Sequence, residues 1–233
     1  MARNLAWGGD LLRVRSLEAR LDWMSLLGRH PHVYRVSIDA PRILLSAQRL
    51  AGFHLRRHPD SPDLQWRVDR LDLQGGSIAV QEPAWGLPSA QAAFWIRGTG
   101  QGPRSLHLEL EAPALVIEAL RGDLRLGADL GDATLAARQG LLRLGSSQIR
   151  FHGAFAPTSQ ALDAAVSGRV DLAEGTRLLP GRHPAAAGSV TFSAALGGTL
   201  DHPTWGLDLR GSELRTDALP MQPGTLALTA RGT

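Results

Sequence analysis

The sequence contains no cysteine and no lysine, and these two absences narrow its chemistry. Without cysteine, thiolate catalysis, cysteine-ligated zinc and disulfide cross-links are excluded. All 25 basic residues are therefore arginine, and 22 acidic residues balance them to a formal net charge of +3. The arginines alternate with acids instead of clustering, as is typical of a solvated sheet face. We expect no nucleic-acid partner, because such a partner requires clustered basic charge.

Long hydrophobic runs and catalytic motifs are also lacking. No apolar run approaches the ~20 residues of a membrane-spanning helix, and the amino terminus has no signal-peptide core. The glycine-rich stretch Gly98–Pro103 lacks the last glycine of a dinucleotide-binding loop. The acidic pairs Asp69/Asp72 and Asp171/Glu174 have arginines nearby and are interpreted as surface salt bridges. The eight histidines are scattered, so we expect no metal site, no cofactor and no enzymatic activity.

Two-residue alternation of apolar and polar side chains is the strongest pattern that is present. Leu106, Leu108 and Leu110 alternate with His107 and Glu109, and similar segments recur along the chain. A period of two indicates half-buried β-strands. The sequence predicts roughly fifteen strands, with a few helical residues ending at position 27 after a strand that contains one phase slip.

Several all-β architectures are compatible with this pattern. A sandwich or barrel, a parallel β-helix, or one long sheet that curls on itself could each bury the apolar faces. No shift in composition marks a boundary, so residues 1–233 are predicted to form a single domain.

Four segments share a proline pattern and align without gaps: Ile38–Leu45, Val80–Leu87, Leu110–Ile117 and Leu200–Leu207. Proline cannot donate to a strand ladder, so each segment predicts a strand end followed by a new strand. Proline is common in β-turns, and the segments could reflect only that. The alternative is an array of similar strand units added one after another.

Three segments resemble the AsmA/TamB-type proteins of the bacterial envelope. The opening "LLRVRSLEARLDWMSLLGRHPHVYRVSIDAPRILL" is similar to the amino-terminal region of that family, and "WRVDRLDLQGGSIAVQE" is similar to its next hairpin. The segment "GTLDHPTWGLDLRGSEL" is similar to a unit that recurs in TamB-like chains. These similarities consist of apolar, glycine and proline positions and include no catalytic signature.

The resemblance implies a β-taco, an all-β, long, mostly antiparallel curled sheet that forms an open groove, with one short helix near the N-terminus. It also implies transport of phospholipids between the inner and outer membranes of a diderm bacterium. The implied location is the periplasm, with an inner-membrane anchor in the full-length protein and an outer-membrane β-barrel protein as a further partner. No anchor segment is recognisable, so the chain is expected to be a fragment from near the amino-terminal end.

The apolar residues of the alternating segments are the candidate lining of a lipid-binding groove. They are Leu71, Leu73, Ile78, Val80, Leu106, Leu108, Leu110, Leu115, Ile117, Leu124, Leu126, Leu142, Leu144, Ile149, Phe151, Val170, Leu172, Val190 and Phe192. One alternative function is that of an extracellular structural or adhesive β-helix or β-sandwich. Another is a carbohydrate-active enzyme, for which the six tryptophans are the main argument.

Overall fold

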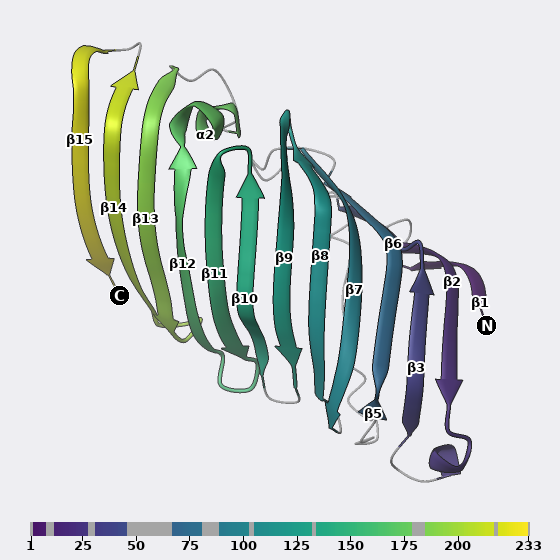
Figure 1. Cartoon of the computed structure of the whole chain (residues 1–233). Coiled ribbons are helices and arrows are strands. Elements are labelled where there is room, and N and C mark those ends of the chain that lie inside the picture. Colours follow the sequence, from purple (N-terminus) through teal and green to yellow (C-terminus); the bar gives the residue numbers. More distant parts are fainter. Residues whose placement is uncertain are drawn as a thin grey trace.

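The computed structural model shows an all-β chain in one long sheet (Figure 1). It describes residues 2–7, 12–27, 31–45, 67–80, 89–102, 105–131, 134–178, 185–216 and 219–232. The predicted fold class, a long and mostly antiparallel curled sheet, is confirmed. A sandwich, a barrel and a β-helix are wrong for these residues, which form a single sheet of fifteen strands.

The strands are β1 (Ala2–Trp7), β2 (Leu12–Leu21), β3 (His32–Asp39), β4 (Arg42–Leu45), β5 (Arg67–Val68), β6 (Arg70–Val80), β7 (Ala90–Gly102), β8 (Ser105–Ile117), β9 (Leu120–Leu130), β10 (Leu135–Leu144), β11 (Ser147–Ala156), β12 (Ala161–Asp171), β13 (Ala186–Gly198), β14 (Pro203–Thr216) and β15 (Leu219–Gly232). The expected helical residues near the N-terminus form the 3₁₀-helix η1 (Met24–Leu27). A second helix, α2 (Leu172–Leu178), was not predicted.

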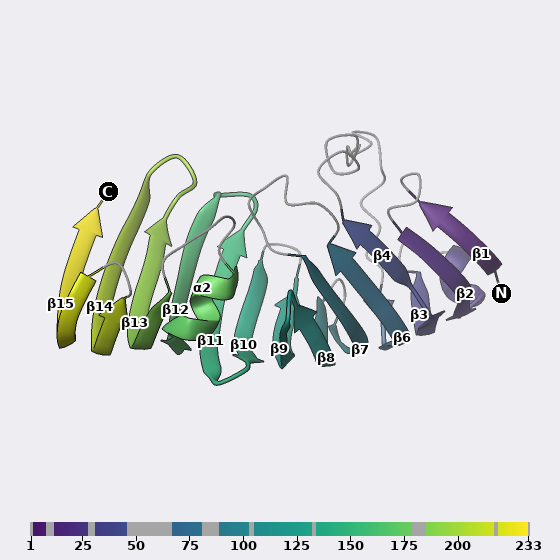
Figure 2. The same cartoon turned by 90° about the horizontal axis from the view of Figure 1, so that it is seen from above.

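From β6 to β15 the chain is an antiparallel meander in which successive strands are neighbours. Two-residue turns join β8 to β9 and β10 to β11, as tight antiparallel connections require. The two chain ends consequently lie at opposite ends of the sheet (Figure 1). Seen from above, the strands lean in opposite directions at the two ends, as in a twisted sheet (Figure 2).

The amino-terminal strands depart from this meander through parallel pairing. Strands β3 and β4 lie on one line beside β6, because Val36 opposite Leu71 and Ile43 opposite Ile78 both give an offset of 35 residues (71 − 36 and 78 − 43). The fifteen strands therefore occupy thirteen positions, since β3 shares its position with β4 and β5 shares one with β6. Twelve spacings of ~4.8 Å give a sheet about 58 Å long.

The proline segments have different outcomes. Pro203 begins β14 after β13 has ended, as predicted. Pro41 separates β3 from β4 and is fully buried, but the two strands continue on one line. Pro113 lies inside β8, where the register shifts between Ala112 and Leu115, so the predicted strand end there is wrong. A β-bulge provides the unpaired position that proline needs. The segment at Val80–Leu87 lies outside the described residues beyond Val80.

The sheet encloses little conventional core. Seven hydrophobic side chains are buried among the described residues, and three of them, Ala92, Phe94 and Ala112, form the core cluster. The chain exposes 15888 Å² of surface, whereas a compact monomer of 25.0 kDa exposes about 10,000 Å².

Candidate functional site

One face of the sheet carries an unbroken row of non-polar residues across twelve strands. Each member is the ladder partner of the next. We call this the central apolar row, and its members are Leu17, Ile38, Leu73, Ile96, Leu110, Leu126, Gly140, Phe151, Val166, Ala194, Leu207 and Ala230. Directly opposed residues of neighbouring strands share one face, so the row is a continuous apolar line across the sheet.

A second row runs beside the first and is non-polar as well. Its members are Ala19, Val36, Leu71, Gly98, Leu108, Ala128, Ala137, Gly153, Ala164, Leu196, Trp205 and Gly232. Residues two apart in a strand point to the same side, so both rows belong to one surface. We call this surface the apolar face.

Eighteen of the nineteen candidate groove residues lie in strands on the apolar face. The exception is Leu172, because the strand ends at Asp171 and Leu172 begins α2. Its expected place in a strand is therefore wrong. The candidate list also missed Leu17, Ile38, Ile96, Val166 and Leu207 of the central row. The two-residue alternation, extended along each strand, would have found these residues.

β-Bulges keep the apolar side chains on one face where the sequence pattern slips. In β10 the register shifts between Ala137 and Gly140, which are three residues apart yet face Gly153 and Phe151 in β11, two residues apart. A similar shift between Leu73 and Gly76 occurs in β6. A β-bulge places one extra residue in the strand, so the apolar side chains that follow it return to the same face.

The apolar face is half-buried by its own side chains. Leu108, Leu126 and Phe192 are each intermediate in exposure. Aromatic rings lie over glycines of the next strand, as Phe151 does over Gly140. This arrangement lets large side chains spread along the sheet while the face stays accessible.

Helix α2 folds back over the strand ends at the edge of the apolar face, near β12 and β13 (Figure 1). The Asp171 carboxylate accepts a hydrogen bond from the Glu174 N–H at 3.2 Å and caps the helix. The Glu174 carboxylate accepts bonds from Ser146 N–H at 3.0 Å and from the Ser147 hydroxyl at 3.1 Å. The interpretation of Asp171 and Glu174 as a surface salt-bridging pair is therefore wrong.

Glycines permit this close approach. The Gly145 backbone, with φ of 59°, leaves no room for a side chain because the Glu174 carboxylate occupies that space. A β-carbon on Gly175 would lie 3.2 Å from Cγ1 of Val170, a residue of the apolar face. Helix α2 is thus a cap over the strand ends at one point on the long edge of the sheet.

The opposite face carries charged side chains, several of them paired across strands. Asp129 accepts from His107 Nδ1 at 2.6 Å and is also bonded to Arg138 Nε. These hydrogen bonds, from His107 first and Arg138 second, hold the pKa of the Asp129 carboxyl below its usual value.

Asp72 forms a second charged cluster among the amino-terminal strands. It is bonded at 2.8 Å to both Arg35 Nη2 and Arg70 Nε. Its expected salt bridges are present, but the Asp72 carboxylate is buried and not at the surface.

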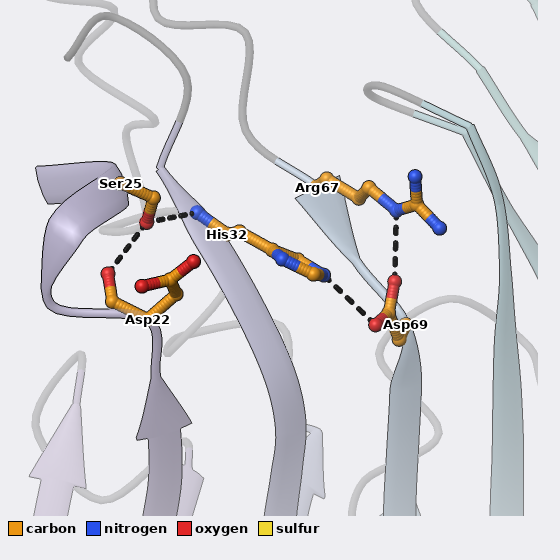
Figure 3. A network of polar contacts seen from close by, with 5 residues as sticks. All are labelled: Asp22, Ser25, His32, Arg67 and Asp69. Atoms are coloured by element: carbon orange, nitrogen blue, oxygen red, sulfur yellow. Dashed lines mark hydrogen bonds and ion pairs between the residues drawn. The ribbon is translucent and has the colours of Figure 1, made fainter.

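A network of Asp22, Ser25, His32, Arg67 and Asp69 has the residue types of a hydrolase triad but a different geometry (Figure 3). The Ser25 hydroxyl donates to the Asp22 carbonyl at 2.6 Å and accepts from the His32 backbone N–H at 2.8 Å. The His32 ring contacts Asp69 through Nε2 at 2.8 Å. Within the described residues, no imidazole nitrogen is bonded to the Ser25 hydroxyl. The network therefore ties β2, β3 and β5 together and lacks the base-to-hydroxyl contact of a triad.

Asp69 holds the far end of this network. It accepts a bond from Arg67 Nε at 2.8 Å as well as the contact with His32. Bonding to Arg67 first, and to His32 second, lowers the pKa of the Asp69 carboxyl. The Asp69 carboxylate therefore stays ionised at a lower pH than an ordinary aspartate.

Within the described part of the chain, no group of three or more histidine and carboxylate side chains could hold a metal ion. Among the same residues, no helix has the length and apolar character needed to cross a bilayer. Comparisons of the chain with protein-family models, with curated proteins and with solved structures found no match.

Proposed function

We propose that the apolar face binds the acyl chains of phospholipids and conducts them along the sheet. The observation that carries the proposal is the central apolar row, which crosses twelve strands without one polar residue. A protein that used this face only for its own core would be expected to cover it. The described residues supply α2 as a cover at one point.

The energetics suit an extended acyl ligand. Burying one methylene group contributes about 0.8 kcal/mol, so ten methylenes on the face contribute roughly 8 kcal/mol. Such contacts have no preferred direction, and neighbouring positions along the row are chemically alike. A lipid tail therefore gains affinity without being fixed at one place. The proposal assigns no chemical reaction to the chain.

The similarity of three segments to AsmA/TamB-type proteins suggests the biological setting of this face. We place the chain in the periplasm of a diderm bacterium, where it would bridge the inner and outer membranes as part of an anchored protein. Phospholipids are then its ligands, and an outer-membrane β-barrel protein is a further partner. The charged opposite face would stay in water.

Lipid extraction of the purified protein, followed by mass spectrometry, tests the proposal. We expect co-purified phospholipid in the wild-type protein and at least a several-fold loss in Phe192→Arg and Leu108→Arg. Both side chains are partly exposed on the apolar face, so the strands should survive in circular dichroism. The matched control is Ser193→Arg, which points to the opposite face beside Phe192 and lies opposite Asp208.

Lipid-free wild-type protein would refute the proposal. Equal lipid loss in Phe192→Arg and Ser193→Arg would refute it too. The loss would then result from the added charge itself and not from its position on the apolar face. If both apolar-face variants unfold while Ser193→Arg does not, these side chains are core and the proposal fails.

A further inference from the structure

The tip between β2 and β3 displays an unusual set of side chains. Trp23 and Met24 are each 76% exposed, Leu27 is 85% exposed and Leu26 is 45% exposed. We call these four residues the η1 tip. Figure 1 shows η1 beyond the ends of β2 and β3, clear of the rest of the sheet. Clustered exposed apolar side chains of this kind mark an interaction surface.

Among the described residues of the same turn, the polar side chains of Asp22 and Ser25 bond to the turn itself and hold it in shape (Figure 3). Asp22 accepts a bond from the Met24 N–H at 3.0 Å, and its own N–H donates to the His32 carbonyl at 2.9 Å. Ser25 bridges Asp22 and the His32 backbone. An ordinary surface turn exposes its polar residues to water, but here Asp22 and Ser25 form hydrogen bonds within the turn while the four apolar side chains are exposed.

We propose that the η1 tip inserts into the interfacial layer of a phospholipid bilayer and attaches this end of the sheet to a membrane surface. The proposal goes beyond acyl-chain binding by the apolar face, since it concerns a separate surface and an intact bilayer. Tryptophan is favoured at the membrane–water boundary, and leucine and methionine bury favourably among acyl chains.

The size of the tip favours a bilayer over a protein partner. A stable protein interface uses about 20 to 30 residues on each side, whereas the tip offers four. A bilayer needs no complementary shape, so a few projecting apolar side chains are enough to insert.

Apolar positions also continue from the tip into the sheet. Leu21, at the end of β2, is the ladder partner of Val33, which is paired in turn with Val68. An inserted tip would therefore place apolar strand ends next to the membrane surface.

The charges around the tip indicate how binding should respond to salt. Arg20 is paired with Glu18, and Arg67 is paired with Asp69. Because these two cations already have acidic partners, they should add little attraction to headgroups, and the proposed insertion rests on the apolar side chains. We expect binding to phosphatidylcholine vesicles, which carry no net charge, and this binding should persist at high salt.

The absence of cysteine permits a site-specific test. Leu27→Cys is labelled with an environment-sensitive fluorophore and mixed with phosphatidylcholine vesicles, and Leu200→Cys serves as the control. Leu200 is a leucine in the β13–β14 connection, 56% exposed. We expect a blue shift and quenching by lipid-borne quenchers at position 27 alone.

Vesicle co-sedimentation of unlabelled variants supplies the affinity. The double variant Met24→Ser/Leu27→Ser should bind vesicles at least about tenfold more weakly than wild type. Leu200→Ser should bind like wild type. Since positions 24 and 27 are largely exposed, both variants should keep the wild-type circular dichroism.

Three results would overturn the assignment. They are equal vesicle binding by wild type and the double variant, a label at position 27 that stays in water on bound protein, and no vesicle binding by wild type. Dimers that form without vesicles and disappear in the double variant would show that a second copy occupies the tip, and would also overturn it. Co-purified lipid should be unchanged in the double variant, so this test fails or succeeds independently of the proposed function.

Discussion

The ring of Phe151 in β11 lies over Gly140 in β10, in the space that a β-carbon at Gly140 would occupy. The two residues are ladder partners in the central apolar row, so the ring covers the glycine backbone of the neighbouring strand. Any side chain at position 140 must displace the ring or bend the strand.

Gly140→Ala should therefore lower the free energy of unfolding by about 1–3 kcal/mol, the range for overpacking a tight site. Urea denaturation followed by circular dichroism measures the change. Gly127→Ala is the control, because a β-carbon there meets only the Gln139 carbonyl oxygen at 3.9 Å. Similar destabilisation of both variants would show that replacing any strand glycine lowers the free energy of unfolding, independently of the Phe151 ring.

Glu174 should hold α2 against the β10–β11 turn. Glu174→Ala removes the acceptor of the Ser146 and Ser147 bonds, which should cost about 1–2 kcal/mol locally. Hydrogen exchange at Ser146 and across α2 should accelerate by about tenfold. Glu174→Gln keeps one acceptor oxygen, so its exchange rates should lie between those of wild type and Glu174→Ala. Unchanged exchange in Glu174→Ala would mean that other contacts hold the helix.

Asp129 should make stability sensitive to acid. Its pKa is lowered in the folded protein from an ordinary value of 3.8, through His107 first and Arg138 second. The stabilisation is thus fully present above the unfolded pKa and is lost as pH falls through the folded pKa. Urea midpoints should drop below about pH 4 in wild type. Asp129→Asn should be less stable at neutral pH and should show a shallower drop.

The control for this measurement is Asp163→Asn, which removes an exposed carboxylate of β12. Asp163→Asn should show the same fall in urea midpoint below about pH 4 as wild type. If Asp129→Asn retains the whole drop, another carboxylate is responsible.

The shape of the chain can be measured in solution. A compact chain of 233 residues has a radius of gyration of about 17 Å. A single-layer sheet about 58 Å long should give a clearly larger value by small-angle scattering. A value near 17 Å would show that the sheet closes or that another part of the chain covers it.

Most strands could be predicted from sequence because one side of each is apolar and the other is polar. The alternation in Leu106–Leu110 directly reports a half-buried strand. The pattern fails at Leu172, since it continues the alternation from Val170, but Asp171 caps a helix there. Local periodicity could not distinguish these outcomes, because the deciding contact is between Glu174 and a turn 28 residues away.

The sequence pattern also could not predict which distant segments pair with each other. The parallel alignment of β3 and β4 with β6 depends on a register that no turn fixes. Phase slips, such as that at Pro113, looked like strand ends, because a bulge and a strand end begin with the same break in alternation. The exposure of the η1 tip could not be predicted either, since Trp23 and Leu27 have the composition of a core.

The antiparallel meander from β6 to β15 has a consequence for how such a chain can change in length. Each hairpin adds two antiparallel strands, so the chain returns to the same strand-end edge of the sheet. Each hairpin also carries its own members of both apolar rows. Removing or duplicating the β10–β11 hairpin would leave the chain direction and the polarity of both faces unchanged. The sheet is modular in that sense, so its span could grow or shrink by whole hairpins while its cross-section stays constant.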